Sequence, residues 1–522
     1  MVYAAGAPDM VSDAAPPSRG SDVPNLFFDS LMSHGADAAP FLAAPGGISL
    51  TYADMRRGAA RMAAALAAQG VAPGDRVAAQ IEKSPEGLML YLGTVMAGGV
   101  FLPLNTAYTA GEIEYFLGDA EPAVMVCDPA SRDAVAKVAG AAKVLTLGAD
   151  GQGTLREATD AAPDGFAPAA RDAHDLAAIL YTSGTTGRSK GAMLTHANLV
   201  SNAEALAEIW RFSAEDRLLH ALPIYHTHGL FVACNTAMRA GASLIFLPKF
   251  DAAAVLRAMP DATVMMGVPT FYTRLLDRAD FTAEAAKGMR LFTSGSAPLL
   301  EETHRAWRER TGHAILERYG MTETNMNTSN PYDGERRAGT VGFPLPGVAL
   351  RIADPETGAD LGRQAIGMIE VKGPNVFKGY WRMPEKTQAE FRDDGYFITG
   401  DLGEIDADGY VHIVGRGKDL VISGGFNVYP KEVELEIDAI DGVLESAVVG
   451  LPHRDFGEGV AAVIVPQPGT ELSEKAVLAA LDGKLAKFKL PKRVLFVDEL
   501  PRNTMGKVQK AALRDKFKAT FQ

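Results

Sequence analysis

The residues most suited to chemistry begin with a loop of glycines and small hydroxyl residues that ends in a lysine. The segment ILYTSGTTGRSKGAML covers residues 179–194 and opens with an apolar, strand-like run. Glycines let the backbone approach a ligand, loop amides and hydroxyls can face phosphate oxygens, and Lys190 adds a positive charge. The residues that we expect to contact a polyphosphate are Thr182, Ser183, Gly184, Thr185, Thr186, Gly187 and Lys190.

The spacing of this loop excludes the Walker A motif of P-loop nucleotide hydrolases. Only two residues separate Gly184 from Gly187, and Gly191 follows Lys190 where that motif has Ser or Thr. The alternative interpretation is a flexible Ser/Gly-rich turn without a ligand. The strand-like run before the loop and the lysine after it favour phosphate binding.

YTSGTTGRSKG resembles the signature loop of the adenylate-forming superfamily, which includes acyl-CoA synthetases, 4-coumarate ligases, beetle luciferases and the adenylation domains of peptide synthetases. Further similar segments are SGSAPL at 294–299, ERYGMTET at 317–324, ITGDLG at 398–403, GRGKD at 415–419, SGGFNVYPKEVE at 423–434 and PRNTMGKVQK at 501–510. The resemblance implies an enzyme that consumes ATP and forms an acyl-adenylate before a thioester of CoA.

The resemblance also implies which side chains contact the nucleotide. Tyr319 would stack on adenine, Thr322 would contact the α-phosphate, and Glu323 would hold Mg²⁺, a cation that prefers oxygen ligands. Asp401 would accept the ribose hydroxyls. The remaining residues expected at the nucleotide are Gly295, Ser296, Ala297, Glu317, Arg318, Arg416 and Lys507.

Lys507 occupies the position of the catalytic lysine in this superfamily. Its ammonium would stabilise the negative charge that develops as a carboxylate attacks the α-phosphorus. Lys418 would be the hinge of a C-terminal domain, and Gly424 and Gly425 would line the path of CoA. Since acetylation would remove the charge of Lys507, a lysine acetyltransferase and a deacetylase are candidate partners.

Arg274, the last residue of GVPTFYTR at 267–274, bears on the choice of acid. The segment should follow a strand and open a helix. A buried Arg there needs an anionic partner, and its guanidinium matches a carboxylate bidentately. One carboxyl group must attack ATP, so a second one on the same acid would suit Arg274. The alternative is a pair between Arg274 and a neighbouring Asp or Glu.

Several segments, among them HALPIYHTHGLF and GVPTFYTRLL, resemble those of malonyl-CoA synthetases, and the similarity covers nearly all of the chain except the tail. That resemblance implies that Arg274, Ser294 and His226 bind the distal carboxylate of malonate. Three alternatives remain. The protein could be a CoA ligase for methylmalonate, acetate or propionate, an adenylation module that loads a carrier protein, or a nucleotide-binding sensor without catalytic activity. No third ligand accompanies His226 and His228 to make a zinc site.

The elements that position these residues follow an alternating pattern. From about residue 48 to 330, strand-like runs such as RVAAQIE and AVMVCD alternate with helix-like stretches such as DMRRGAARMAAALAAQ, which predicts parallel α/β layers. Short β-like runs between about 341 and 415 predict a β-rich subdomain. The expected fold is therefore α/β, with layered N-terminal subdomains, this small β-rich subdomain and a mobile C-terminal α+β domain. The expected division is a disordered tail over 1–22, a large domain over 23–416 and a small domain over 417–522.

Composition and charge narrow the class of protein. The chain has 522 residues, 47% hydrophobic and 22% charged, which is typical of a globular protein with more than one core. The formal net charge of −13 argues against partners such as nucleic acid or an anionic membrane. Cys127 and Cys234 stand in apolar surroundings and are predicted to be reduced core thiols. The tail lacks a secretory or transit pattern, which predicts a cytoplasmic protein, with Met10 as an alternative start.

Overall fold

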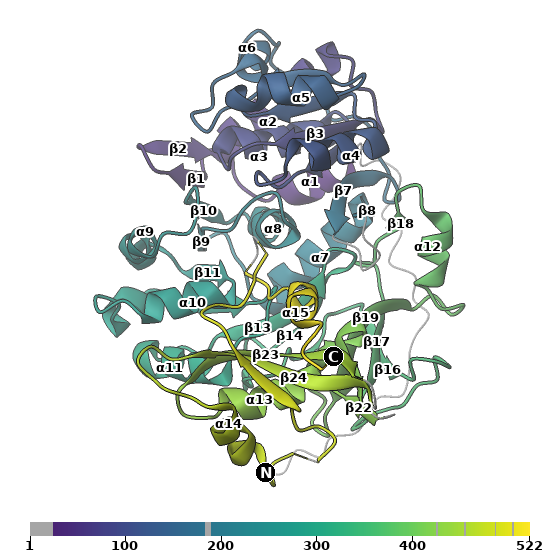
Figure 1. Cartoon of the computed structure of the whole chain (residues 1–522). Helices are drawn as coiled ribbons and strands as arrows, with labels where there is room; N and C mark the ends of the chain where they lie inside the picture. Colours follow the sequence, from purple (N-terminus) through teal and green to yellow (C-terminus); the bar gives the residue numbers. More distant parts are fainter. Residues whose placement is uncertain are drawn as a thin grey trace, which may run out of the picture.

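Two large sheets of mostly parallel strands form the body of the protein (Figure 1). The computed structural model describes residues 25–182, 189–423, 426–453, 456–485, 487–503 and 506–521. One sheet consists, from edge to edge, of β18 (Gly379–Tyr380), β8 (Lys190–Thr195), β7 (Leu176–Thr182), β4 (Val100–Pro103), β3 (Arg76–Gln80), β5 (Val124–Cys127) and β6 (Lys143–Thr146). The other consists of β15 (Phe343–Pro344), β14 (Asn325–Ser329), β13 (Leu316–Met321), β12 (Leu291–Ser294), β11 (Val264–Gly267), β9 (Arg217–His220), β10 (Ser243–Phe246), β1 (Pro40–Ala44) and β2 (Ile48–Thr51).

Helices connect and cover these strands, which confirms the alternating pattern predicted for residues 48–330. They are α1 (Leu26–Met32), α2 (Tyr52–Ala68), α3 (Pro85–Met96), α4 (Ala110–Ala120), α5 (Arg132–Val138), α6 (Thr154–Asp160), α7 (His196–Ile209), α8 (Asn235–Arg239), α9 (Ala252–Ala258), α10 (Pro269–Leu276), α11 (Glu301–Thr311) and α12 (Pro384–Ala389). Local sequence sets their starts. Thr51 and Asp54 form a capping box at α2, and Ser84 caps α3 ahead of Pro85.

One hydrophobic core unites the facing sides of both sheets. It contains Val77 and Leu180 from the first sheet, Leu218 and Leu316 from the second, and the fully buried Trp210.

As predicted, Cys127 and Cys234 are buried thiols. No helix among the described residues combines the length and the apolar character that are needed to cross a bilayer.

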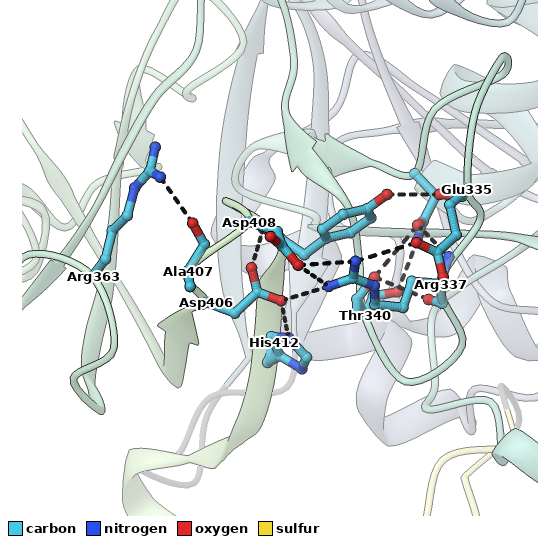
Figure 2. Close-up of polar contacts among 10 residues, drawn as sticks. Glu335, Arg337, Thr340, Arg363, Asp406, Ala407, Asp408 and His412 are labelled. Atoms are coloured by element: carbon cyan, nitrogen blue, oxygen red, sulfur yellow. Dashed lines mark hydrogen bonds and ion pairs between the residues drawn. The ribbon is translucent and has the colours of Figure 1, made fainter. Parts of the chain in front are cut away.

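A separate antiparallel sheet carries residues of the site at its edge. It comprises β16 (Ala349–Ala353), β17 (Gly367–Lys372), β19 (Phe397–Ile405) and β20 (Val411–Arg416). The β19–β20 hairpin is tied to the segment after β14 by Arg337, which Figure 2 shows between three carboxylates. The Arg337 guanidinium lies 3.0 Å from Asp406, 3.1 Å from Asp408 and 3.2 Å from Glu335. This network fixes the hairpin that presents Asp401 and Arg416.

The C-terminal region forms its own sheet and cores, drawn in yellow-green at the lower end of Figure 1. Its strands are β22 (Phe426–Val428), β21 (Val421–Ser423), β24 (Gly457–Pro466) and β23 (Val443–His453), with β25 (Arg493–Phe496) paired to β24. Its helices are α13 (Pro430–Asp438), α14 (Glu474–Leu481) and α15 (Lys510–Phe517). The loop before α15 reaches the body, because a Cβ at Gly506 would lie 3.6 Å from Thr270 of α10.

Candidate active site

Polar residues gather where the strands of both large sheets end. β7 ends at Thr182, β12 ends at Ser294, and β13 carries the segment from Glu317 to Tyr319. β12 and β13 are parallel neighbours that pair Ser294 with Glu317, so the predicted segments SGSAPL and ERYGMTET are adjacent. The carboxyl ends of parallel strands are the usual place for ligands in such sheets.

The predicted adenosine-binding residues form one hydrogen-bonded group. The Tyr319 hydroxyl donates to Asp401 Oδ2 at 2.5 Å, and Arg416 Nε lies 2.6 Å from Asp401 Oδ1. β19 and β20 pair Asp401 directly with Arg416. Asp401 raises the pKa of Arg416, and burial together with Asp401 raises the pKa of Tyr319, so the phenol stays neutral and the guanidinium stays charged.

The neighbouring turn after β12 is shaped for close packing. A Cβ at Gly295 would collide with Arg318 Nη1, and Ser296 adopts a left-handed backbone with φ of 69°. Such a conformation in a residue other than glycine is typical of functional sites. Ala297, which follows this turn, and Thr322, which follows β13, are partly buried. Burial raises the pKa of Glu317, on β13, to about 8.

At the expected phosphate end, two carboxylates share one tyrosine hydroxyl. Tyr380 donates to Glu323 Oε1 at 3.1 Å and to Glu390 Oε2 at 2.6 Å. Thr182 Oγ1 donates to Glu323 Oε1 at 3.4 Å, and Lys190 Nζ lies 3.1 Å from Glu390 Oε1. Ser183, Gly184, Thr185, Thr186 and Gly187 of the predicted phosphate loop, and Gly424 and Gly425 of the predicted CoA path, lie outside the described residues.

Lys507 lies among the charged groups of the site although it belongs to the C-terminal region. Its side chain is exposed to solvent, and the charges of Arg416, Asp401 and Lys418 act on it. Partial desolvation, followed by the positive charge of Arg416, lowers the pKa of Lys507 to about 8. Burial lowers the pKa of His226 to about 4, and the charges of Arg318 and Lys507 act in the same direction. His226 is therefore neutral near pH 7.

Arg318 is the buried cation of the site. Only 3% of its surface is exposed, and its Nε and Nη2 atoms have no hydrogen-bond partner among the described residues. The buried hydroxyl of Ser294 likewise lacks a described partner. Burial lowers the pKa of Arg318 to about 10, which leaves it protonated. A buried guanidinium with unused donors is costly, so this arrangement is suited to an anion that enters the site.

Arg274 is not buried as predicted. The segment does open a helix after a strand, but Arg274 is exposed on α10, whereas Tyr272 and Leu275 are the residues of that helix that are buried. Residues three apart share one face of a helix, and residue 274 falls on another. The premise that Arg274 is buried is therefore wrong, and Arg318, which the sequence placed at the nucleotide, has the burial expected of a carboxylate-binding arginine.

The two histidines of PIYHTHG stand at the start of a π-helix (His228–Cys234). His226 Nδ1 accepts from the backbone N–H of His228 at 3.3 Å, so the proton of the neutral ring is on Nε2, where it can be donated to a ligand. His228 Nδ1 lies 3.2 Å from Ser296 Oγ, and its buried Nε2 has no described partner. π-helices are rare and are common at functional sites.

Lys83 supports this π-helix and was missed by the sequence interpretation. It is 8% exposed, and its Nζ lies 2.6 Å from His220 Nδ1 and 4.2 Å from the centroid of the Phe246 ring. His220 Nε2 in turn lies 2.8 Å from the carbonyl oxygen of Gly229. Burial holds the pKa of Lys83 well below its usual value. Its position three residues after the end of β3 was the available signal.

Comparison with known proteins agrees with this fold. The chain matches the AMP-binding enzyme family over residues 31–381 and the AMP-binding enzyme C-terminal domain over residues 432–507. ATP-bound MatB from Rhodopseudomonas palustris superimposes with a TM-score of 0.94 at 62% identity and covers 95% of this chain and 100% of its own. The apo form of the same protein gives a TM-score of 0.84, over 95% of this chain and 100% of its own.

Relatives with named activities are similar over most of their length. A malonate–CoA ligase from Arabidopsis thaliana is 36% identical over 480 residues, which are 85% of this chain and 78% of that protein. A feruloyl-CoA synthase from an Amycolatopsis species is 37% identical over 476 residues, which are 90% of this chain and 95% of that protein.

The fold and the site thus define an adenylate-forming enzyme, as the signature loop predicted. The chain belongs to the AMP-binding enzyme family, and it is an ATP-dependent, AMP-forming acyl-CoA ligase.

Proposed function

We propose that this ligase is a malonyl-CoA synthetase, which converts malonate, ATP and CoA to malonyl-CoA, AMP and pyrophosphate through a malonyl-adenylate. The observation that carries the proposal is Arg318, a buried cation with donors that have no described partner. The buried hydroxyl of Ser294, on the neighbouring strand, also has no described partner. No described carboxylate forms an ion pair with Arg318. A dicarboxylic acid would supply one carboxylate to this arginine and the other to ATP.

We assign the distal carboxylate to Arg318, with Ser294 and the Nε2–H of His226 as neutral donors. Arg274 was the sequence-based candidate, and its exposure on α10 suits a position outside the pocket. Overall identity does not choose the acid, because the malonate–CoA ligase and the feruloyl-CoA synthase are almost equally similar to this chain. The similarity to MatB at 62% identity is consistent with the proposal.

Methylmalonate is the nearest rival substrate. It has the same two carboxylates and one additional methyl group, and a methyl group changes binding by only about 1–3 kcal/mol. A carrier-protein adenylation module is the second rival, and dependence of AMP release on free CoA separates it from the proposal. Acetate and propionate lack the group that Arg318 would bind.

In the first half-reaction, the free carboxylate of malonate attacks the α-phosphorus and pyrophosphate leaves. Lys190 and the phosphate loop would bind the polyphosphate, Thr322 would contact the α-phosphate, and Lys507 would stabilise the developing charge. Tyr319 and Asp401 would orient the adenosine. Of these groups, Tyr319 and Asp401 are hydrogen-bonded to each other, which supports a shared role at the adenosine.

Glu323 fits the Mg²⁺ ion that ATP brings. Glu323 is 6% exposed, burial raises its pKa, and its Oε1 accepts hydrogen bonds from the hydroxyls of Thr182 and Tyr380. Mg²⁺ usually binds one or two carboxylates together with substrate phosphates. When bound, the ion would neutralise charge on the polyphosphate. The side chains of the protein would bind and orient the substrates and stabilise the developing charge.

In the second half-reaction, CoA thiol displaces AMP. We propose that residues 417–522 turn about Lys418, so that Lys507 withdraws from residues 23–416 and the segment of Gly424 and Gly425 takes its place. One site then serves two reactions in turn, a recognised use of domain movement. An acetyltransferase that modified Lys507 would remove its charge and stop the first half-reaction alone.

The pH dependence of adenylation should report Lys507. The charged form is the active one, and its pKa is lowered to about 8, so the charged fraction falls as pH rises through 8. We expect kcat/KM for adenylation to fall about tenfold per pH unit above that value, since kcat/KM reports groups of the free enzyme. The measurement is ATP–pyrophosphate exchange from pH 6 to 10.

Lys507→Arg is the control, because its side chain stays charged through this range. The activity that it retains should show no decline near pH 8. Glu317 also titrates near pH 8, so a decline that persists in Lys507→Arg would assign the titration to Glu317 and contradict the prediction.

The experiment that tests the proposed function is AMP release with Mg²⁺, ATP and CoA across malonate, methylmalonate, succinate, acetate, propionate and octanoate. We expect malonate to give the highest kcat/KM. A preference for acetate or octanoate would leave the ligase class intact and reject the dicarboxylate assignment.

A further inference from the structure

We propose that Glu390 competes with the polyphosphate for Lys190 and thereby promotes release of pyrophosphate. The inference rests on the proposed function, in which Lys190 binds the β- and γ-phosphates of ATP and then the pyrophosphate product. Glu390 matches none of the motifs that the sequence singled out. It acts through Lys190, so its effect is on binding of the leaving product rather than on the reacting atoms.

The pairing of two strands brings Glu390 to Lys190. β18 pairs antiparallel with β8, so that Tyr380 lies opposite Ala192 and the N–H of Trp381 donates to the carbonyl oxygen of Gly191 at 2.7 Å. Lys190, the first residue of β8, then has its Nζ 3.1 Å from Glu390 Oε1 and 4.0 Å from the centroid of the Tyr380 ring. The ammonium is thus held by a carboxylate and an aromatic face.

Glu390 is itself fixed and charged. Lys386 Nζ lies 2.7 Å from its Oε1, and the Tyr380 hydroxyl donates to its Oε2 at 2.6 Å. Burial alone would raise its pKa, but the hydrogen bonds from Lys386 and Tyr380 and the charge of Lys190 outweigh burial and lower it. Because 20% of the Glu390 side chain and 10% of the Lys190 side chain are exposed, solvent screens this pair only partly.

A bound polyphosphate meets this carboxylate in either geometry that Lys190 can adopt. If the ammonium turns to the phosphates, the ion pair with Glu390 is lost. If it stays, the phosphates approach a fixed negative charge. Both geometries weaken polyphosphate binding, so the direction of the effect does not depend on which one occurs.

The weaker binding affects pyrophosphate more than ATP. ATP is also held through its adenosine, at Tyr319 and Asp401, whereas pyrophosphate has no such second attachment. After the adenylate forms, pyrophosphate therefore depends on the cations around Lys190, and Glu390 takes part of that attraction away. In this account Glu390 helps to clear pyrophosphate before the second half-reaction begins.

The test uses Glu390→Gln in the full-length enzyme, which keeps the size of the side chain and its acceptor for Tyr380 but removes the charge. We expect calorimetry with Mg²⁺–pyrophosphate to give binding on the order of tenfold tighter than wild type, since the charged hydrogen bond that competes for Lys190 is removed. Pyrophosphate should inhibit the forward reaction more strongly by a similar factor. Glu385→Gln removes an exposed carboxylate of α12, the helix that ends just before Glu390. It is the matched control and should bind pyrophosphate like wild type.

Lys190→Met separates this inference from the function on which it rests. If Lys190→Met binds Mg²⁺–pyrophosphate as well as wild type, Lys190 does not bind polyphosphate and the proposed phosphate site is wrong. If Lys190→Met binds weakly while Glu390→Gln binds like wild type or more weakly, the phosphate site stands and the competition by Glu390 is rejected. Weaker binding in Glu390→Gln would make Glu390 a residue that holds Lys190 in its binding position.

Discussion

Lys507→Met should reduce formation of the acyl-adenylate by about 10²–10³-fold and leave thioester formation from supplied malonyl-adenylate close to the wild-type rate. The magnitude is that found when one preorganised group is removed from a developing negative charge. The charge is well placed for the first step, because Lys507 interacts with Asp401, Arg416 and His226. Displacement of AMP by a thiol takes place, in our proposal, with this lysine withdrawn.

The two half-reactions are measured separately, as malonate-dependent ATP–pyrophosphate exchange and as conversion of added malonyl-adenylate with CoA. Lys518→Met is the matched control, because Lys518 is an exposed lysine of the same C-terminal region that pairs with Asp515. It should leave both rates unchanged. An equal loss of both half-reactions in Lys507→Met would contradict the division of labour between the two conformations.

The second large effect is expected at Arg318. Arg318→Met should lower kcat/KM for malonate by about 30- to 3,000-fold, because losing one partner of a buried charge pair costs about 2–5 kcal/mol. Activity with propionate, which has no distal carboxylate, should fall far less. Arg274→Met should stay within about threefold of wild type for both acids, as is usual for an exposed side chain.

Thermal unfolding separates a lost contact from a damaged fold. Arg318 is buried without a described ion-pair partner, so an apolar side chain of similar length should leave the melting temperature of the free protein unchanged or raise it. Malonate should raise the melting temperature of wild type and of Arg274→Met but not of Arg318→Met. Selective loss of malonate activity in Arg274→Met, with Arg318→Met unaffected, would restore the sequence-based assignment.

Much of the fold could be predicted because its signals are local. The strand-like runs RVAAQIE and AVMVCD contain β3 and β5. Motifs placed Tyr319, Asp401 and Arg416 at one ligand, and these side chains do contact one another. Such predictions depend on a few consecutive residues, whose hydrophobic pattern and turn chemistry are visible in the sequence.

The parts that could not be predicted depend on distant partners or on the orientation of one side chain. Lys190 and Glu390 are 200 positions apart and meet because β18 pairs with β8. Lys83 and His220 are 137 positions apart. The sequence analysis gave the carboxylate to Arg274 and put Arg318 at the nucleotide. The helical face that buries Tyr272 and Leu275, and the close approach of Gly295 to Arg318, show that Arg318 is the more buried of the two arginines.

The separate cores of the C-terminal region have a consequence for calorimetry. Its buried clusters include Val421 and Leu513 but no residue of the large core of the body, which extends only to Phe397. Turning this region about Lys418 would therefore open no shared apolar core, and the accompanying change in heat capacity should be small, because heat capacity follows exposure of apolar surface. The same separation predicts a thermogram with two endotherms rather than one, since the two regions can lose their structure independently.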